Sequence, residues 1–349
     1  MKPLSINGQL IGMDYQAYVI AEISANHNQD IQEAIDLIHI AKQCGANAVK
    51  IQTYTPDTMT INCDNEYFQI GKGTIWEGKN LYELYGEACT PWDWTPRLIE
   101  EANKIGITLF SSPFDSSSVD FLEDLKMPAY KIASFELVDH QLIARVAKTG
   151  KPVIMSTGMG TLEEISEAVE VLQTNGCSEY ALLKCTSSYP APVEEANLAR
   201  MHHMTETFRV PVGLSDHTMG SAVAVTAVAL GACIIEKHFT KSRDIEGPDS
   251  SFSMEPDEFR QMVEAVRMAE KAVGEVTYEL TEKEKNSRVF RRSLFVVEPI
   301  AAGEELTREN IRIIRPGYGL APKFLEDVLG RTAKQDIARG TPLCWNQLD

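Results

Sequence analysis

Two short motifs, SDH ending at His217 and EKH ending at His238, each follow an apolar, β-branched run. The two histidines are 21 positions apart, about one strand–helix unit, so they would fall at the ends of neighbouring strands. Two imidazoles with open positions beside them suit one divalent ion of Mn, Fe, Co or Zn. The alternative is that one or both only form hydrogen bonds, but the matched spacing favours the metal site.

The order Ser-Asp-His also suggests a hydrolase triad. Successive side chains on a strand point to opposite faces, so Ser215, Asp216 and His217 cannot form a serine–histidine–aspartate relay. In EKH the same alternation puts Glu236 on the face of His238, where it could orient the imidazole. Lys237 is expected to point away from that face and to be structural.

Lysines and serines recur at the ends of the other apolar runs. They are Lys50, Lys131, Lys184, Ser112, Ser134, Ser156, Ser187 and Ser215. Ammonium and hydroxyl groups both donate to phosphate and carboxylate oxygens, so the set predicts a cradle for a small anion. Lysines that only form salt bridges, or a desolvated Schiff-base lysine in an aldolase, are the alternatives. Glu22 and Glu136 are candidates for acid–base chemistry, for substrate binding or for pairing with a lysine.

Eight β-rich runs carry these residues, and segments with helical apolar spacing separate them. The runs are residues 18–24, 48–54, 108–112, 129–134, 152–157, 180–186, 210–215 and 233–239. Eight strands alternating with helices predict an α/β protein with a (β/α)8 TIM barrel, whose functional residues lie at the carboxyl ends of strands. A doubly wound open sheet gives a similar pattern, but no G-x-G-x-x-G motif follows the first run.

Two further segments depart from the alternation. Residues 55–95 form a long insertion rich in Tyr, Trp and Gly, which we expect to lie over the mouth of the barrel. We predict a barrel domain over 1–277, a charged linker over 278–292 and a small β-rich domain over 293–349. PIAAG and DIARG within the last segment resemble two versions of one turn.

Composition limits the possible partners. The 349 residues are 44% apolar and 24% charged, as in an ordinary globular protein, and the net charge of −17 argues against broad binding of nucleic acid or anionic membranes. Seven cysteines without a C-x-x-C pair indicate reduced thiols. The first residues lack the apolar core of a signal peptide, and no run approaches the length of a membrane span. We therefore expect a cytoplasmic protein.

The strand-end motifs as a set resemble a known family. The set is AEISANHN, VKIQTY, YKIASFE, MSTGMG, KCTSSYP, GLSDHTMG, EKHFT and GPDSSFSM, followed by RSLFVVEPIAAGE and RPGYG. It is similar to the sialic acid synthases over essentially the whole chain. LYELYGEACTPWDW, YTPDTMT and RPGYGLAPKF look most like the pseudaminic branch, which serves bacterial nonulosonic acid biosynthesis and often flagellin glycosylation.

The resemblance implies a TIM barrel joined to an antifreeze-like (SAF) domain, in a domain-swapped homodimer. It implies condensation of phosphoenolpyruvate with an N-acyl amino sugar, 2,4-diacetamido-2,4,6-trideoxy-L-altrose in the pseudaminic branch. The reaction releases phosphate by C–O cleavage. It also implies a divalent metal, Mn or Mg and in some members Co, that polarises the sugar aldehyde.

Residue roles follow from the resemblance position by position. The metal ligands are His217 and His238, and the catalytic residues are Glu22, Lys50 and Glu136, with Glu136 positioning or deprotonating water. Phosphoenolpyruvate would be bound by Lys50, Ser112, Lys131, Ser134, Ser156, Ser187 and Ser215. The sugar would be bound by Glu22, Gln52, Tyr189, Asp249 and Arg315, the last from the small domain of the partner subunit.

Two departures separate the chain from the neuraminate branch. Ser187 stands where that branch has Asn, and the second strand reads IQTY rather than HQTH. Both differences fit the pseudaminic branch. Synthesis of N-acetylneuraminate or legionaminate from another N-acyl amino sugar is the alternative activity, and a non-catalytic sugar-binding protein is the alternative of another class.

Overall fold

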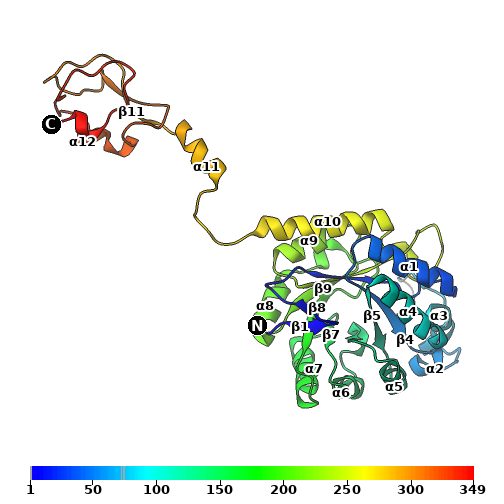
Figure 1. The fold of residues 1–349 in the computed structure, drawn as a ribbon. Helices are drawn as coiled ribbons and strands as arrows, with labels where there is room; N and C mark the ends of the chain where they lie inside the picture. The colour runs from blue at the N-terminus through cyan, green and yellow to red at the C-terminus, as the bar shows by residue number, and fades with distance from the viewer. Residues whose placement is uncertain (1, 72, 74) are drawn as a thin grey trace. The chain divides into compact units, whose positions relative to one another are not determined.

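The computed structural model describes residues 2–71, 73 and 75–349 of the chain. It divides into two compact units, Met1–Gly274 and Glu275–Asp349 (Figure 1). The predicted limits of barrel, linker and small domain stay a prediction. Among the described residues, no helix has the length and the apolar composition to cross a membrane.

Eight parallel strands of the first unit close into a barrel. They are β3 (Tyr18–Glu22), β4 (Ala48–Thr53), β5 (Thr108–Pro113), β6 (Tyr130–Ile132), β7 (Val153–Ser156), β8 (Tyr180–Cys185), β9 (Val212–Asp216) and β10 (Ile234–His238). The circle closes where β10 pairs with β3, with Ile234 opposite Tyr18 and His238 opposite Glu22. This confirms the TIM barrel and excludes an open sheet.

Helices surround the strands on the outside of the barrel (Figure 1). They are α1 (Ile31–Gln43), α4 (Thr95–Ile105), α5 (Ser116–Asp124), α6 (His140–Ala147), α7 (Leu162–Thr174), α8 (Ala199–Phe208), α9 (Ala222–Ala229) and α10 (Pro256–Val273). The sequence marks several of their ends. Thr161 and Glu164 form a capping box at the start of α7. Gly106 ends α4 in the left-handed conformation, with φ of 67°.

Alternation along the strands produces two layers inside the barrel. Pairing places Glu236 opposite Ser215 and Ile20, and Lys50 opposite Glu22 and Phe110. Earlier inward positions are apolar or small. Gly213 is one of these positions. A larger residue would not fit there, because its Cβ would lie 2.7 Å from the Ile234 Cβ. The inward positions nearer the carboxyl ends are polar, so the polar residues gather at that end.

A hairpin covers the amino-terminal end of the barrel. Strands β1 (Leu4–Ile6) and β2 (Gln9–Ile11) pair antiparallel around an Asn7-Gly8 turn. Asn7 Nδ2 donates to Thr108 Oγ1 at the start of β5 (3.3 Å). This hairpin was not predicted from the sequence, although Asn-Gly is a strong hairpin signal.

The insertion between β4 and β5 carries short helices joined by loops. It contains α2 (Pro56–Met59), the 3-10 turn Glu66–Phe68, α3 (Leu81–Ala88) and the 3-10 turn Trp92–Trp94. Asn80 caps α3 by accepting a hydrogen bond from the Tyr82 backbone. A second ordered segment, containing the turn Ser250–Phe252, follows β10.

The second unit is a small β-rich domain with its own core. Strands β11 (Ser293–Val296) and β12 (Ile311–Ile314) pair antiparallel, and α12 (Leu325–Val328) follows. The PIAAG and DIARG segments pair through reciprocal Ile300–Ile337 backbone hydrogen bonds (2.9 and 2.8 Å). The short helix α11 (Glu282–Ser287) lies in the charged segment before β11.

Candidate active site

Buried ionic groups occupy the carboxyl-terminal layer of the barrel interior. Lys50 forms an ion pair with Glu22 and lies 3.9 Å from Glu236 Oε1, and Lys131 Nζ lies 3.4 Å from that oxygen. Ser215 Oγ donates to Glu236 Oε1 (3.1 Å), and Lys50 Nζ donates to Ser112 Oγ (3.4 Å). The two lysines predicted to bind an anion therefore lie in one network with two carboxylates.

This network corrects the expectation for Glu236. Its described polar contacts are with Lys50, Lys131 and Ser215, and the carboxylate close to the His238 ring is Asp249 instead. Glu236 therefore balances the lysines rather than orienting the imidazole.

Mutual charge favours the ionised forms of Lys50 and Glu236. Burial alone would lower the pKa of Lys50, but Glu22 and Glu236 raise it above its usual value. Burial alone would raise the pKa of Glu236, and Lys131 and Lys50 hold it below its usual value. Burial outweighs Glu236 at Lys131, whose pKa is lowered. Buried charges of opposite sign in contact offset each other's desolvation.

The two histidines of the SDH and EKH motifs face each other at the next level outward. The ring centroids of His217 and His238 are 5.4 Å apart. Tyr189 packs on His217 at 4.3 Å between centroids, and Phe252 packs on the edge of His238 at 4.9 Å. Strand alternation thus brings the pair together at the ends of β9 and β10, as the spacing predicts.

Hydrogen bonding suits these imidazoles to metal binding. His217 Nδ1 lies 2.9 Å from the Thr186 carbonyl oxygen, and since a carbonyl only accepts, this nitrogen donates and Nε2 is left with a lone pair. His238 Nδ1 is buried without a hydrogen-bond partner among the described residues, 3.6 Å from Asp249 Oδ2. Burial and His217 together lower the pKa of His238 well below its usual value, which favours the neutral form that binds metals.

Two imidazoles do not enclose an ion. Within the described part of the chain, no group of three or more His, Cys, Asp or Glu side chains is arranged to hold a metal. A divalent ion on His217 and His238 would therefore keep several positions open for substrate or water. Burial opposes charge on His217, but Cys185 and the Thr186 carbonyl raise its pKa, so protons would compete with such an ion.

Serine hydroxyls lie around Gly158, just after β7. The Gly158 backbone N–H donates to Ser134 Oγ (3.1 Å). A Cβ on Gly158 would lie 2.6 Å from that oxygen and would also clash with Ser187 Oγ. Ser156 Oγ is buried with no described hydrogen-bond partner. The absence of a side chain at Gly158 therefore lets two of the predicted phosphate-binding serines approach each other.

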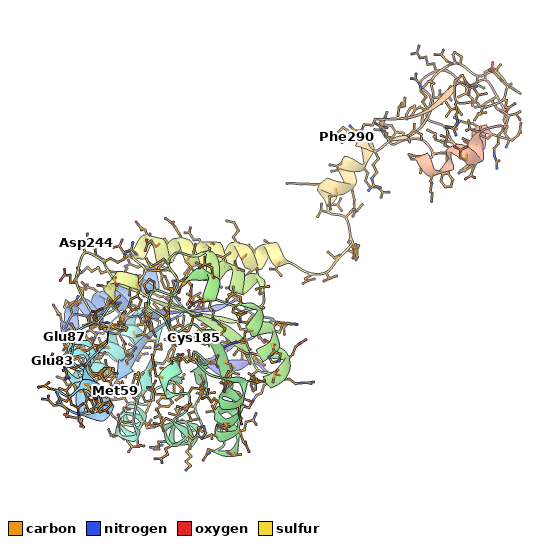
Figure 2. All side chains as sticks on the ribbon, turned by 180° about the vertical axis from the view of Figure 1, so that it is seen from behind. Met59, Glu83, Glu87, Cys185, Asp244 and Phe290 are labelled. Atoms are coloured by element: carbon orange, nitrogen blue, oxygen red, sulfur yellow. The ribbon has the colours of Figure 1, made fainter. Side chains whose placement is uncertain are left out.

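A cavity of about 350 Å³ opens above these groups, within the size range of small-molecule sites. Its lining includes five predicted residues, Gln52, Glu136, Tyr189, His238 and Asp249. The insertion contributes much of the rest, so it covers the mouth of the barrel as predicted. Figure 2 marks Met59 of the insertion, which lines this cavity, and Cys185 at the end of β8.

The insertion is tied to the barrel by side-chain hydrogen bonds. Trp76 Nε1 donates to the Pro248 carbonyl (2.8 Å) beside Asp249, and its ring packs against Tyr189. Gln29 Nε2 donates to the carbonyls of Glu87 and Cys89 at the end of α3 (3.0 and 2.8 Å). These contacts fix the outer wall of the cavity on the strand ends.

Two carboxyl groups in the cavity lining are poised to exchange protons near neutral pH. Burial raises the pKa of Glu136 to about 7, and Glu136 Oε2 has no described hydrogen-bond partner. Burial, together with the charge of Glu22, raises the pKa of Asp249 to about 7. Groups with a pKa near the working pH are suited to general acid–base catalysis.

The structure places two of the lysines outside the network of Lys50 and Lys131. Lys184 Nζ donates to Thr186 Oγ1 and to the Glu195 carbonyl, away from Lys50 and Lys131. Lys237 pairs with Asp216 Oδ2 (2.7 Å) on the other strand face, which fits the structural role expected for it. Arg315 belongs to the second unit, and its predicted action on a partner's site stays a prediction.

Some residues that line the cavity were not predicted from the sequence. Tyr54 shares the face of Lys50 and Gln52 by strand alternation, so its place in the lining could have been inferred. Tyr85 and Trp76 come from the insertion, whose detailed packing no periodicity reveals.

The thiol of Cys185 was also not predicted as part of the site. Its Sγ lies 3.9 Å from His217 Nδ1. Burial would raise the thiol's pKa, but His217 brings it down to about 6.

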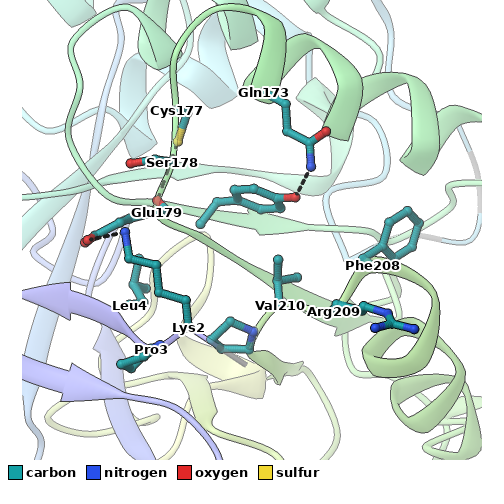
Figure 3. A pocket seen from close by; sticks show the side chains of 12 residues that line it. Lys2, Pro3, Leu4, Gln173, Cys177, Ser178, Glu179, Phe208, Arg209 and Val210 are labelled. Atoms are coloured by element: carbon teal, nitrogen blue, oxygen red, sulfur yellow. Dashed lines mark hydrogen bonds and ion pairs between the residues drawn. The ribbon is translucent and has the colours of Figure 1, made fainter.

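A second cavity, of about 320 Å³, lies beside the amino-terminal segment (Figure 3). Lys2 pairs there with Glu179 (3.2 Å), and Gln173 Nε2 donates to the Tyr180 hydroxyl (2.7 Å). None of the predicted site residues lines this cavity. The cavity at the carboxyl ends of the strands is therefore the candidate active site.

Comparison with known proteins agrees with this geometry. Residues 37–278 match the NeuB family model, and residues 291–349 match the SAF domain model. Pseudaminic acid synthase of Helicobacter pylori is 45% identical over 95% of this chain and 97% of its own. N,N'-diacetyllegionaminic acid synthase of Legionella pneumophila is 35% identical over 97% and 96%.

A solved structure, N-acetylneuraminic acid synthetase of Leptospira borgpetersenii, superposes with a TM-score of 0.73 at 29% identity. The match covers 82% of this chain and 95% of that one. The family model matches more than half of the chain, and the relatives match nearly all of it. The chain belongs to the NeuB family of sialic acid synthases, with a C-terminal SAF domain.

Proposed function

We propose that the protein is a pseudaminic acid synthase. It condenses phosphoenolpyruvate with 2,4-diacetamido-2,4,6-trideoxy-L-altrose to give pseudaminic acid and phosphate. The observation that carries the proposal is the higher identity to the Helicobacter pylori pseudaminic acid synthase, 45%, than to the Legionella pneumophila legionaminic acid synthase, 35%. Membership of an enzyme family removes the alternative of a non-catalytic sugar-binding protein.

Phosphoenolpyruvate binds in the carboxyl-terminal layer of the barrel. Lys50 and Lys131 supply charge, and the serines near them donate hydrogen bonds; the set is Ser112, Ser134, Ser156, Ser187 and Ser215. The unpartnered Ser156 hydroxyl and the serines brought together at Gly158 support this assignment. Ammonium and hydroxyl donors bind both anionic groups of this substrate.

The sugar occupies the cavity above. Gln52, Tyr189 and Asp249 line it, and Glu22 lies just below, bound to Lys50. His217 and His238 hold a divalent ion, Mn or Mg, which supplies Lewis-acid polarisation of the sugar aldehyde when bound. The free lone pair expected at His217 Nε2 and the unpartnered His238 Nδ1 support this role.

Carbon–carbon bond formation starts when C3 of phosphoenolpyruvate attacks the aldehyde carbon. Water then adds to C2, and the resulting tetrahedral centre releases phosphate by C–O cleavage. Glu136 positions the water and accepts its proton, for which a pKa of about 7 is suited. Glu22 and Lys50, which are in contact, hold the reacting ends of both substrates.

The active unit is a domain-swapped homodimer. Arg315 of the SAF domain reaches the sugar's N-acyl group in the partner's barrel. The small domain has its own apolar core, including Leu294, Val296 and Leu343, so it can move as a unit in such an exchange.

Synthesis of legionaminic acid is the second candidate function, because the legionaminic acid synthases are also close relatives. The test is phosphate release from phosphoenolpyruvate and Mn with the L-altro sugar, its legionaminate-forming isomer, or N-acetylmannosamine. Phosphate release fastest with the L-altro sugar is expected. Turnover of another sugar in its place would reassign the branch, and absence of turnover with every sugar would refute the activity.

A further inference from the structure

The cavity at the barrel mouth has an apolar wall, and most of that wall comes from the insertion. The apolar residues of the wall are Met59, Ile70, Leu81 and Leu84 from the insertion, and Phe114 and Phe135 from loops that follow barrel strands. The polar lining comes instead from the strand ends and from the loops that follow them. A substrate in the cavity therefore meets acids and donors on one side and hydrocarbon on the other.

Helix α3 turns one of its faces to this cavity. Leu81, Leu84, Tyr85 and Ala88 all line it, at the i, i+3, i+4, i+7 spacing of a single helical stripe. The opposite side of α3 carries exposed acids, of which Figure 2 labels Glu83 and Glu87. Such a stripe packs against a protein core in most surface helices, whereas here it borders the space where the sugar is proposed to bind.

Leu84 stands at the middle of this stripe and is only 8% exposed. Its helix is tied to the barrel loops on both sides, by the Trp76 hydrogen bond to Pro248 before it and by the Gln29 hydrogen bonds at its end. The wall is therefore a fixed surface. A hydroxyl group placed against it would lose water without gaining a partner, whereas a methyl group would be buried favourably.

We propose that the α3 stripe, centred on Leu84, determines sugar specificity by accepting a methyl-terminated substituent. The proposal rests on the proposed function and identifies the part of the site that recognises the substrate class. The methyl group can be the terminal carbon of a 6-deoxy sugar or the end of an acetamido group. Both have the same chemistry, and the experiment distinguishes them.

The test measures kcat/KM of the full-length enzyme for three sugars. They are the 2,4-diacetamido-6-deoxy sugar, its 6-hydroxy counterpart and its 4-propionamido counterpart. Wild type is expected to prefer the first by about tenfold or more over each of the others, the usual effect of one group in an apolar pocket. The enzymes compared are wild type, Leu84→Gln and Leu84→Ala.

If the wall contacts the terminal carbon, Leu84→Gln loses most of the preference over the 6-hydroxy sugar. If it contacts the acyl end, Leu84→Ala gains activity on the propionamido sugar. Either result supports the proposal, and unchanged ratios in both variants overturn it. A ratio taken on one enzyme preparation is unaffected by partial unfolding.

Leu98→Ala is the matched control, because Leu98 on α4 is buried but does not line the cavity. It should leave every ratio unchanged, and ratios that shift equally in this control overturn the proposal. Failure of the proposed function is recognised separately, because wild type would then release no phosphate with any of these sugars.

Discussion

At the scale of single residues, three buried polar atoms at the barrel mouth stand out. Ser156 Oγ, Glu136 Oε2 and His238 Nδ1 lack hydrogen-bond partners within the described part of the chain. An unpaired buried polar atom costs roughly 1–3 kcal/mol. Glu136 and His238 line one cavity, which indicates that substrates, a metal ion or water complete their bonding.

Replacing either imidazole should abolish metal-dependent turnover without unfolding the barrel. His217→Ala or His238→Ala is expected to lower kcat by about a hundredfold or more, because each removes half of the protein's donors to the ion. The measurement is phosphate release during a Mn titration, with circular dichroism to check the fold. His202→Ala, at an exposed histidine of α8, is the control. Undiminished turnover by the His238 variant in the presence of a chelator would rule out the metal role.

Glu136 should give the pH profile its acidic limb. The side chain acts as a base only when ionised, so kcat is expected to fall as the pH drops through about 7. Glu136→Gln should lower kcat by about a hundredfold or more and flatten that limb. A profile that keeps the same limb in the variant would assign the ionisation to another group.

Protein stability provides an independent readout of the same carboxyl group. Its pKa is higher in the folded protein, about 7, than the ordinary 4.5, so its contribution to stability is lost as the pH rises from 4.5 through 7. Glu136→Gln should therefore gain stability relative to wild type between pH 5 and pH 8, on the order of 3 kcal/mol. Equal pH dependence of the two melting curves would contradict a buried, protonated Glu136.

At the scale of elements, the turn after β7 controls how close the serines come. A methyl group at Gly158 would clash with the hydroxyl oxygens of Ser134 and Ser187. Gly158→Ala should therefore raise the KM for phosphoenolpyruvate by about tenfold, with a smaller effect on the KM for the sugar.

Steady-state kinetics with each substrate varied in turn would check this expectation. Gly86→Ala on α3 is the matched control, because its new Cβ would meet only Pro56, at an ordinary 3.7 Å. Equal changes in both KM values in the Gly158 variant would point to general damage instead of a phosphate site.

The elements also show what periodicity can predict. All eight barrel strands were predicted because each is an apolar run that ends in polar residues, and the histidine pair followed from the spacing of the last two. The sequence predicted that the insertion covers the mouth, but not that the α3 stripe lines the cavity, since this stripe looks like that of any helix packed on a core. The contact of Glu236 with two lysines was missed because it depends on three different strands.

At the scale of the whole molecule, the proposed swapped dimer makes a sharp prediction. His238→Ala and Arg315→Ala are each expected to be inactive, and co-refolding them should restore about a quarter of wild-type activity. Random association makes half of the dimers mixed. If Arg315 acts on the partner's barrel, one of the two sites in each mixed dimer has both native residues, so about a quarter of all sites are active.

The controls are each variant refolded alone and the mixture of separately folded variants, neither of which should gain activity. If Arg315 served the barrel of its own chain, every site would lack one residue and the mixture would stay inactive. The sequence suggests this arrangement only through family resemblance, because a small domain with its own core does not reveal which barrel it serves.

The amino-terminal hairpin has a kinetic consequence. It lies at the amino-terminal end of the barrel, whereas the cavity lies at the carboxyl-terminal end, so we expect both proposed substrates to enter from the side of the cavity. Lys50 and Lys131 lie one layer below the cavity that is proposed for the sugar. For the proposed reaction, phosphoenolpyruvate is therefore expected to bind before the sugar, and phosphate is expected to leave after the nine-carbon product. We therefore expect an ordered kinetic mechanism, in which the first substrate to bind gives rise to the last product to be released.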